Sequence, residues 1–134
     1  MKTRILISAL LAAAALAGLA IGLALAAGRA PSAASEARAV AAQFFRTIDQ
    51  RHYAQTCNLL SARFYRQNHV PDKRHCLLGL SVGMAMSPSY RFEIADVRLT
   101  SRGALVSALA NGQPGRLVLV REEGGFKVLA VQGS

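Results

Sequence analysis

The chain has 134 residues, a formal net charge of +9, two cysteines and no tryptophan. This length suits one domain with a modest hydrophobic core. Its arginines are scattered singly rather than gathered in runs, which is typical of a solvated surface and does not indicate a nucleic-acid-binding tract.

The first segment, residues 1–27, predicts export. Lys2 and Arg4 precede an uncharged apolar run over residues 5–27, as in a secretory signal. As a helix this run would reach about 35 Å, enough to cross a bilayer, whereas Ala24-Leu25-Ala26 fits the small-residue pattern at which signal peptides are cleaved. A retained membrane anchor and a cleaved signal peptide therefore both stay open. In either case the remainder is expected outside the cytoplasm, as a membrane-attached, periplasmic or secreted domain.

Small residues recur on one face of the apolar run and include the pair Gly18 and Gly22. Such spacing lets two membrane helices approach closely, although an alanine- and glycine-rich segment also produces it by chance.

Export argues against nucleic acid as a partner. An anionic membrane surface or an acidic envelope polymer is more available to an exported basic domain.

Helical patterns dominate the first half of the remaining chain. Residues 28–35 are small and polar and predict a linker, so the folded domain is expected over residues 36–134. A long amphipathic helix is predicted from residue 36 to about 53, because large apolar residues recur at four-residue spacing. Two further helices are predicted over 54–67 and 73–86. The turn between them contains Pro71 and Asp72, and Asp72 can cap the third helix.

Strand patterns follow. Alternation of apolar and polar residues begins at Tyr90 and changes register near Ala95-Asp96, which predicts a β-bulge. Three more strands are predicted, and short glycine-containing turns separate them, so the strands should form an antiparallel meander. The predicted strands cover residues 104–110, 117–121 and 126–131. The expected fold class is α+β, with three N-terminal helices on a curved antiparallel sheet of about four strands, after one N-terminal hydrophobic helix.

Three local patterns carry a family resemblance over about residues 36–131. They are the FF…I…D pattern of Phe44, Phe45, Ile48 and Asp49, the C.LL pattern of Cys57, Leu59 and Leu60, and the GG-F-K-V run from Gly124 to Val128. With the helices-then-meander order, the chain resembles the nuclear transport factor two-like superfamily, the cone of ketosteroid isomerase and SnoaL-like proteins. It is most similar to small exported bacterial members with paired cysteines. The resemblance implies a cone-shaped domain whose sheets often pair into dimers, but the superfamily spans enzymes, adaptors and secretion-system parts.

Export also bears on the cysteines. Thiols outside the cytoplasm can oxidise and stay oxidised, and two cysteines allow one intramolecular pairing, so a Cys57–Cys76 disulfide is expected; two free buried thiols are the alternative for a cytoplasmic domain. A metal site formed with His69 and His75 is not expected. Adjacent His75 and Cys76 would point about 100° apart on a helix.

Acid–base catalysis is the enzymatic alternative, since enzymes of the resembling fold keep a tuned carboxylate or histidine inside the cone. The sequence assigns no catalytic residue, no cofactor and no metal, because no nucleophile elbow or phosphate-binding loop is present and no acid is clearly placed inward. The candidate pocket residues are Asp49, His52, Tyr53, Tyr65, Tyr90 and Asp96, with His75 as a further candidate.

The sequence therefore favours a non-catalytic exported or membrane-anchored domain of the bacterial envelope that binds a partner or a small ligand. A homodimer is expected through the sheet face or through the small-residue face of the apolar run. The first alternative is an isomerase- or hydratase-like enzyme that uses Asp49, His52 or Asp96. The second is a structural component of an envelope transport or secretion complex.

Overall fold

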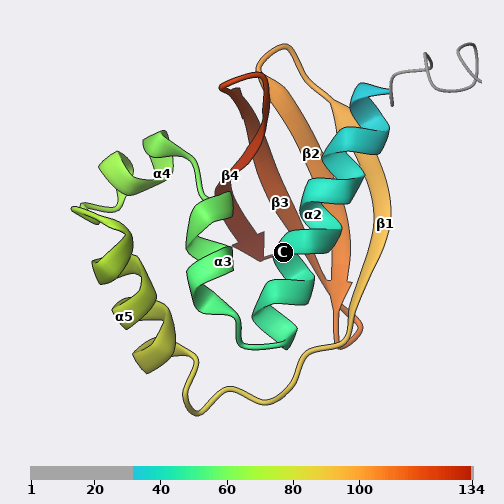
Figure 1. The fold of residues 1–134 in the computed structure, drawn as a ribbon. Helices are drawn as coiled ribbons and strands as arrows, with labels where there is room; N and C mark the ends of the chain where they lie inside the picture. The colour runs from blue at the N-terminus through green and yellow to red at the C-terminus, as the bar shows by residue number, and fades with distance from the viewer. Residues whose placement is uncertain (1–31, 134) are drawn as a thin grey trace, which may run out of the picture. The chain divides into compact units, whose positions relative to one another are not determined.

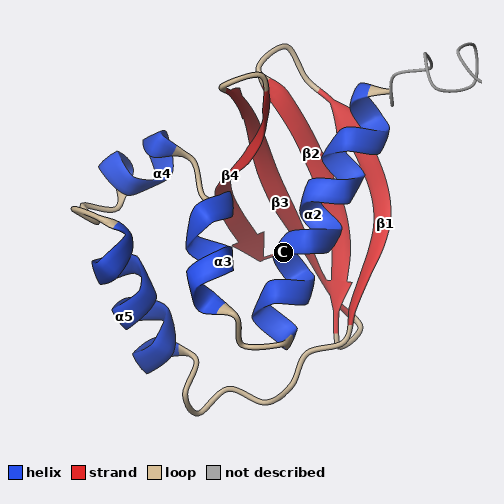
Figure 2. Cartoon of the chain, viewed as in Figure 1, coloured by secondary structure: helices blue, strands red, loops and turns tan. Residues whose placement is uncertain are grey.

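A computed structural model describes residues 32–133 as an α+β unit, in which four helices precede an open antiparallel sheet of four strands (Figures 1 and 2). The predicted leader, its apolar helix and the Gly18–Gly22 face lie outside the described residues. No helix within the described range is long and apolar enough to span a membrane. The elements are α2 (Ala33–Asp49), α3 (Tyr53–Leu59), α4 (Ala62–Gln67), α5 (Lys73–Gly83), β1 (Phe92–Leu99), β2 (Gly103–Ala110), β3 (Gln113–Glu122) and β4 (Gly125–Gly133).

The long helix α2 lies across the sheet and supplies most of the helical side of the core. It begins at Ala33, inside the segment predicted as a linker, because the Ser32 hydroxyl accepts a hydrogen bond from the Ser35 amide at 3.1 Å and caps the helix. Small residues on its buried face let the helix backbone approach the sheet, while two phenylalanines fill the remaining space. The buried apolar residues of α2 are Ala37, Ala41, Phe44 and Phe45.

The prediction of three helices after the leader was wrong in number, since residues predicted as one helix form α3 and α4. Leu60 is extended and forms a parallel bridge with Val128 of β4, and the Ser61 amide donates to the Val128 carbonyl at 2.8 Å. The Ser61 hydroxyl then caps α4 by accepting from the Phe64 amide at 2.9 Å. Pairing with the edge of β4 therefore interrupts the helix.

The strands follow the sequence order β1-β2-β3-β4, and every neighbouring pair is antiparallel, as predicted for a meander. The predicted bulge is confirmed, because the β1–β2 register shifts between Ile94 and Asp96. One face of the sheet packs against α2. The buried residues of that face are Ala104, Val106, Ala108, Leu117, Leu119, Phe126 and Val128. Because the order leaves β1 at an edge, α2 and β1 border an open groove.

The predicted disulfide is present between Cys57 of α3 and Cys76 of α5, and both residues are buried. Asp72 caps α5 as predicted, since its carboxylate accepts from the His75 amide at 2.8 Å. The closest packing of α5 is against α3, and Figure 1 places α5 at the periphery of this unit, with α3 between it and the sheet. The disulfide thus ties an outlying helix to the main body.

Candidate functional site

Two of the predicted pocket residues, Asp49 and Tyr90, meet at an open groove between α2 and β1. The groove has a volume of 460 Å³. We call it the arginine groove; its lining consists of Arg38, Ala42, Phe45, Arg46, Asp49, Tyr90, Arg91, Phe92 and Ile94. Tyr53 lies next to it, in a much smaller hollow of 10 Å³ that Asp49 and Tyr90 also line.

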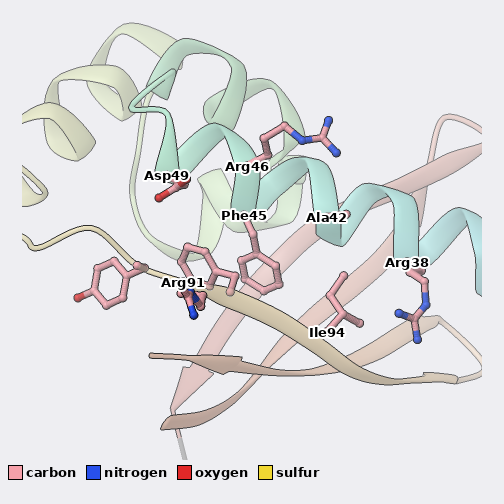
Figure 3. A pocket seen from close by; sticks show the side chains of 9 residues that line it. Arg38, Ala42, Phe45, Arg46, Asp49, Arg91 and Ile94 are labelled. Carbon is pink, nitrogen blue, oxygen red and sulfur yellow. The ribbon is translucent and has the colours of Figure 1, made fainter. Parts of the chain in front are cut away.

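Helical spacing explains how α2 contributes its side of the groove. Arg38, Ala42, Phe45 and Asp49 are four and three residues apart, so they share one face of the helix. Ala42 is the smallest of them and leaves space above the strand. Alternation explains the other side, because Phe92 and Ile94 of β1 both face the helix. In Figure 3 the Phe45 and Ile94 side chains extend into the space between α2 and β1.

Aromatic rings form a continuous wall at one end of the groove. The ring centroids of Tyr90 and Phe92 are 5.6 Å apart, and those of Phe92 and Phe45 are 4.5 Å apart with an interplanar angle of 13°. Phe45 also makes an edge-on contact with buried Phe44 at 5.9 Å. The core thereby supports one end of the aromatic series, which gives a flat or apolar ligand a rigid surface to lie against.

The groove is positively charged, because three arginines and only one carboxylate, that of Asp49, are among its lining residues. Within the described range, the side chains of Arg38, Arg46 and Arg91 form no hydrogen bond or salt bridge. Figure 3 shows the Arg38 guanidinium on the strand side of α2 and that of Arg46 turned away from β1. Arg38 and Arg91 are therefore the cations best placed to meet an anion in the groove.

Asn111 fixes the backbone at the entrance to β1. Its side-chain oxygen accepts a hydrogen bond from the Arg91 backbone amide at 2.7 Å, and the backbone amide of Asn111 donates to the Arg91 carbonyl at 2.9 Å. Asn111 has a φ of 51°, in the left-handed region that asparagine tolerates better than most residues. This turn holds Arg91 and its two aromatic neighbours in position beside α2.

The other predicted pocket residues do not join the arginine groove. His52 is exposed at the N-terminal end of α3, and its side chain makes no capping hydrogen bond. Asp96 is exposed at the bulge of β1. Tyr65 of α4 is half-buried, and its hydroxyl donates to the Cys57 carbonyl at 2.7 Å. Burial, and then the charge of Asp72, raise the pKa of the Tyr65 phenol, which is consistent with a structural hydrogen bond.

Ionisable groups suited to proton transfer are not gathered in this part of the chain. The buried polar side chains among residues 32–133 are Thr47, Thr56 and Ser61, and none of them is ionisable in the physiological range. The Thr56 hydroxyl donates to Thr47 at 2.8 Å, and Thr47 donates to the Phe44 carbonyl at 2.8 Å. No cluster of three or more potential metal ligands occurs over the same residues. His75 contacts Asp72 at 2.7 Å in an exposed pair, which lowers the pKa of Asp72 mainly through the side-chain hydrogen bond.

The chain matches no protein-family model, no curated protein and no solved structure.

Sequence reasoning missed the main residues of the groove. Neither Arg38 nor Arg91 was among the predicted pocket residues. The spacing of Arg38, Phe45 and Asp49 was visible in the sequence, as was the alternation of Tyr90 and Phe92. What the sequence did not reveal was that these two patterns face each other across the edge of the sheet.

Proposed function

We propose that this protein is a non-catalytic binding domain of the bacterial cell envelope, and that its arginine groove binds an amphipathic anion. The ligand class is an organic carboxylate, sulfonate or phosphate ester with an aromatic or aliphatic body. Its charged group would meet Arg38 or Arg91, which lie on either side of Phe45 and Ile94 (Figure 3), and its apolar body would lie against Phe45 and Phe92. The observation that carries this proposal is the juxtaposition of unpaired arginines with a supported aromatic wall.

The size of the groove supports a small ligand. Its 460 Å³ lies within the range of about 300–1,000 Å³ that is usual for small-molecule sites. The arginines are exposed, so salt and water weaken their attraction to an anion. We therefore expect binding in the micromolar to millimolar range, with affinity that falls as ionic strength rises.

The envelope location is part of the same proposal. The Cys57–Cys76 disulfide is compatible with an oxidising compartment outside the cytoplasm, and the charged-then-apolar leader predicts export. Residues 5–27 would attach the domain to the membrane if the leader is retained. Helices followed by a four-stranded meander, with α2 across one face, support membership of the nuclear transport factor two-like superfamily.

A homodimer through the uncovered sheet face belongs to this proposal as well. Apolar residues of the central strands, Leu105, Val118 and Val120, lie on the face opposite α2 and are half-buried.

The arrangement of the acids and the histidine disfavours the isomerase or hydratase alternative, because Asp49, His52 and Asp96 are exposed and dispersed. The envelope-complex alternative requires a protein partner, and the groove is better suited to a small molecule.

Binding of anilinonaphthalene sulfonate, an aromatic anion whose emission rises in apolar surroundings, tests the proposal. The double substitution Arg38→Gln/Arg91→Gln should raise its Kd at least fivefold, since each arginine contributes about 0.5–1 kcal/mol to such an exposed contact. Arg98→Gln/Arg102→Gln removes two exposed cations outside the groove lining and serves as the matched control.

Two further measurements separate charge from shape. Neutral phenylnaphthylamine should bind the Arg38→Gln/Arg91→Gln protein as well as it binds the unaltered protein. Ala42→Leu should weaken both probes, because the longer side chain fills the groove. Equal losses for the groove variant and the control variant would show that net charge alone attracts the anion, and would end the proposal.

A further inference from the structure

Helix α5 exposes a row of large apolar side chains. We call this row the α5 stripe; it consists of Leu78, Val82 and Met86, whose exposed fractions are 62%, 70% and 95%. Leu78 and Val82 are four positions apart and share one face of the helix, and Met86 lies in the turn that follows the helix end at Gly83. Leu77, 39% exposed, lies beside them. Apolar side chains gathered in this way mark an interaction surface more often than single exposed ones do.

The stripe faces away from the body of the domain. Cys76 is buried and Leu80 is half-buried against the core, and Leu78 lies about 160–200° around the helix from both. The disulfide at Cys76 holds this orientation, because it fixes the roll of α5 against α3. Figure 1 shows no other described element on the outer side of α5. The stripe is therefore presented rigidly and is uncovered by the described residues.

The charged side chains of α5 itself have one sign. Lys73 and Arg74 form the first turn of α5, and Arg74 is four residues before Leu78, on the same face. No aspartate or glutamate occurs from Lys73 to Phe92. The acid at the start of α5, Asp72, is occupied as the helix cap and by His75, and Glu122 and Glu123 line a hollow together with Lys73. A helix face that is apolar along its length and cationic at one end complements a surface that is apolar beneath and anionic on top.

We propose that the α5 stripe docks on the surface of an anionic lipid bilayer. Leu78, Val82 and Met86 enter the boundary between headgroups and acyl chains, while Lys73 and Arg74 contact lipid phosphates. Interfacial helices bind in this way, by modest apolar insertion added to electrostatic attraction. A protein partner is disfavoured, because three or four side chains fall well short of the roughly 800 Å² per partner of a stable protein interface. The docking surface uses none of the residues that line the arginine groove.

The absence of tryptophan from the chain allows a direct test. Val82→Trp places a single fluorescent reporter on the stripe, and Val131→Trp places one at a similarly exposed valine on β4, with exposed fractions of 70% and 64% for the two valines. The full-length variants are reconstituted in vesicles of phosphatidylcholine, with or without phosphatidylglycerol, and with acyl chains that carry a bromine quencher. Insertion of residues 5–27 contributes equally to both variants and leaves the reporter comparison intact.

The expected result is a blue-shifted emission and at least twofold quenching for Val82→Trp in the anionic vesicles only, with no change for Val131→Trp in either. Adding Lys73→Gln/Arg74→Gln to Val82→Trp should lower apparent lipid affinity by about fivefold for each cation removed. Equal quenching of both reporters, or no lipid response at position 82, would overturn the proposal. A blue shift that grows with protein concentration in the absence of lipid would also overturn it, since a second copy of the chain would then be the occupant.

Discussion

Removal of the disulfide tests how α5 is held. Cys57 and Cys76 are 19 positions apart, and closing a loop of that length stabilises the folded state by about 3 kcal/mol in the chain-entropy account. Both cysteines are buried, so Cys57→Ala/Cys76→Ala also removes packed sulfur atoms and avoids leaving a free thiol. We expect the double variant to lose about 3–5 kcal/mol of unfolding free energy.

The loss should begin locally. An isolated helix as short as α5, with Gly79 inside it, is not stable in water, and its main packing is against α3. Hydrogen exchange should therefore show α5 amides losing protection in the double variant before those of α2 and β2. Guanidinium unfolding followed by circular dichroism gives the free energy, and a reductant should destabilise the unaltered protein but leave the double variant unchanged. A free-energy change below about 1 kcal/mol, with α5 still protected, would show that the disulfide does not hold α5 in place.

Three further predictions concern stability. Gly103→Ala should lower the free energy of unfolding by about 1–3 kcal/mol, because the new Cβ would overlap the backbone of β3. Gly79→Ala meets open space and should raise the free energy of unfolding by about 0.5–1 kcal/mol, and thermal unfolding compares the two variants. The His75 contact lowers the pKa of Asp72, so the unaltered protein should be more stable than Asp72→Asn above about pH 4. This difference in unfolding free energy should disappear as the pH falls through the lowered pKa, and unfolding measured over an acid pH series would show it. Tyr65→Phe should cost about 1 kcal/mol in denaturant unfolding.

Each of these predictions has an outcome that contradicts it. Equal melting temperatures for Gly103→Ala and Gly79→Ala would mean that β2 and β3 separate easily at this point. A constant difference between Asp72 and its asparagine variant at every pH would remove the role of the carboxylate charge. For Tyr65, burial raises the pKa of the phenol, so the midpoint of its ultraviolet titration should lie above the ordinary value for tyrosine. A midpoint at the ordinary value would place the hydroxyl in solvent.

Local chemistry allowed much of the fold to be predicted. The β1 bulge follows from the change of alternation near Ala95-Asp96, and the β2–β3 turn follows from Asn111 and Gly112, which both have positive φ. The Asp72 cap is also a local signal, since its carboxylate bonds an amide three residues later. The cysteine pairing was limited to one choice by their number. In each case the physical cause lies within a few residues or in simple counting.

The features that were missed depend on contacts between distant segments. The break between α3 and α4 arises because Leu60 and Ser61 pair with Val128, and helical spacing of apolar residues conceals it. The arginine groove likewise depends on α2 lying beside β1, which places Arg38 and Arg91 in the lining of one groove. Periodicity shows which face of an element is apolar, but it does not show which partner covers that face or where coverage ends.

Chemical-shift mapping by NMR tests directly whether the arginine groove binds an aromatic anion. Naphthoate, an aromatic carboxylate, is titrated into isotope-labelled protein at low salt, and backbone amide shifts are followed for every described element. We expect saturable shifts concentrated along the groove face of α2 and from Tyr90 to Ile94, and the loss of these shifts in Arg38→Gln/Arg91→Gln. Shifts spread evenly over exposed arginines such as Arg98 and Arg102, or centred on another surface, would contradict it.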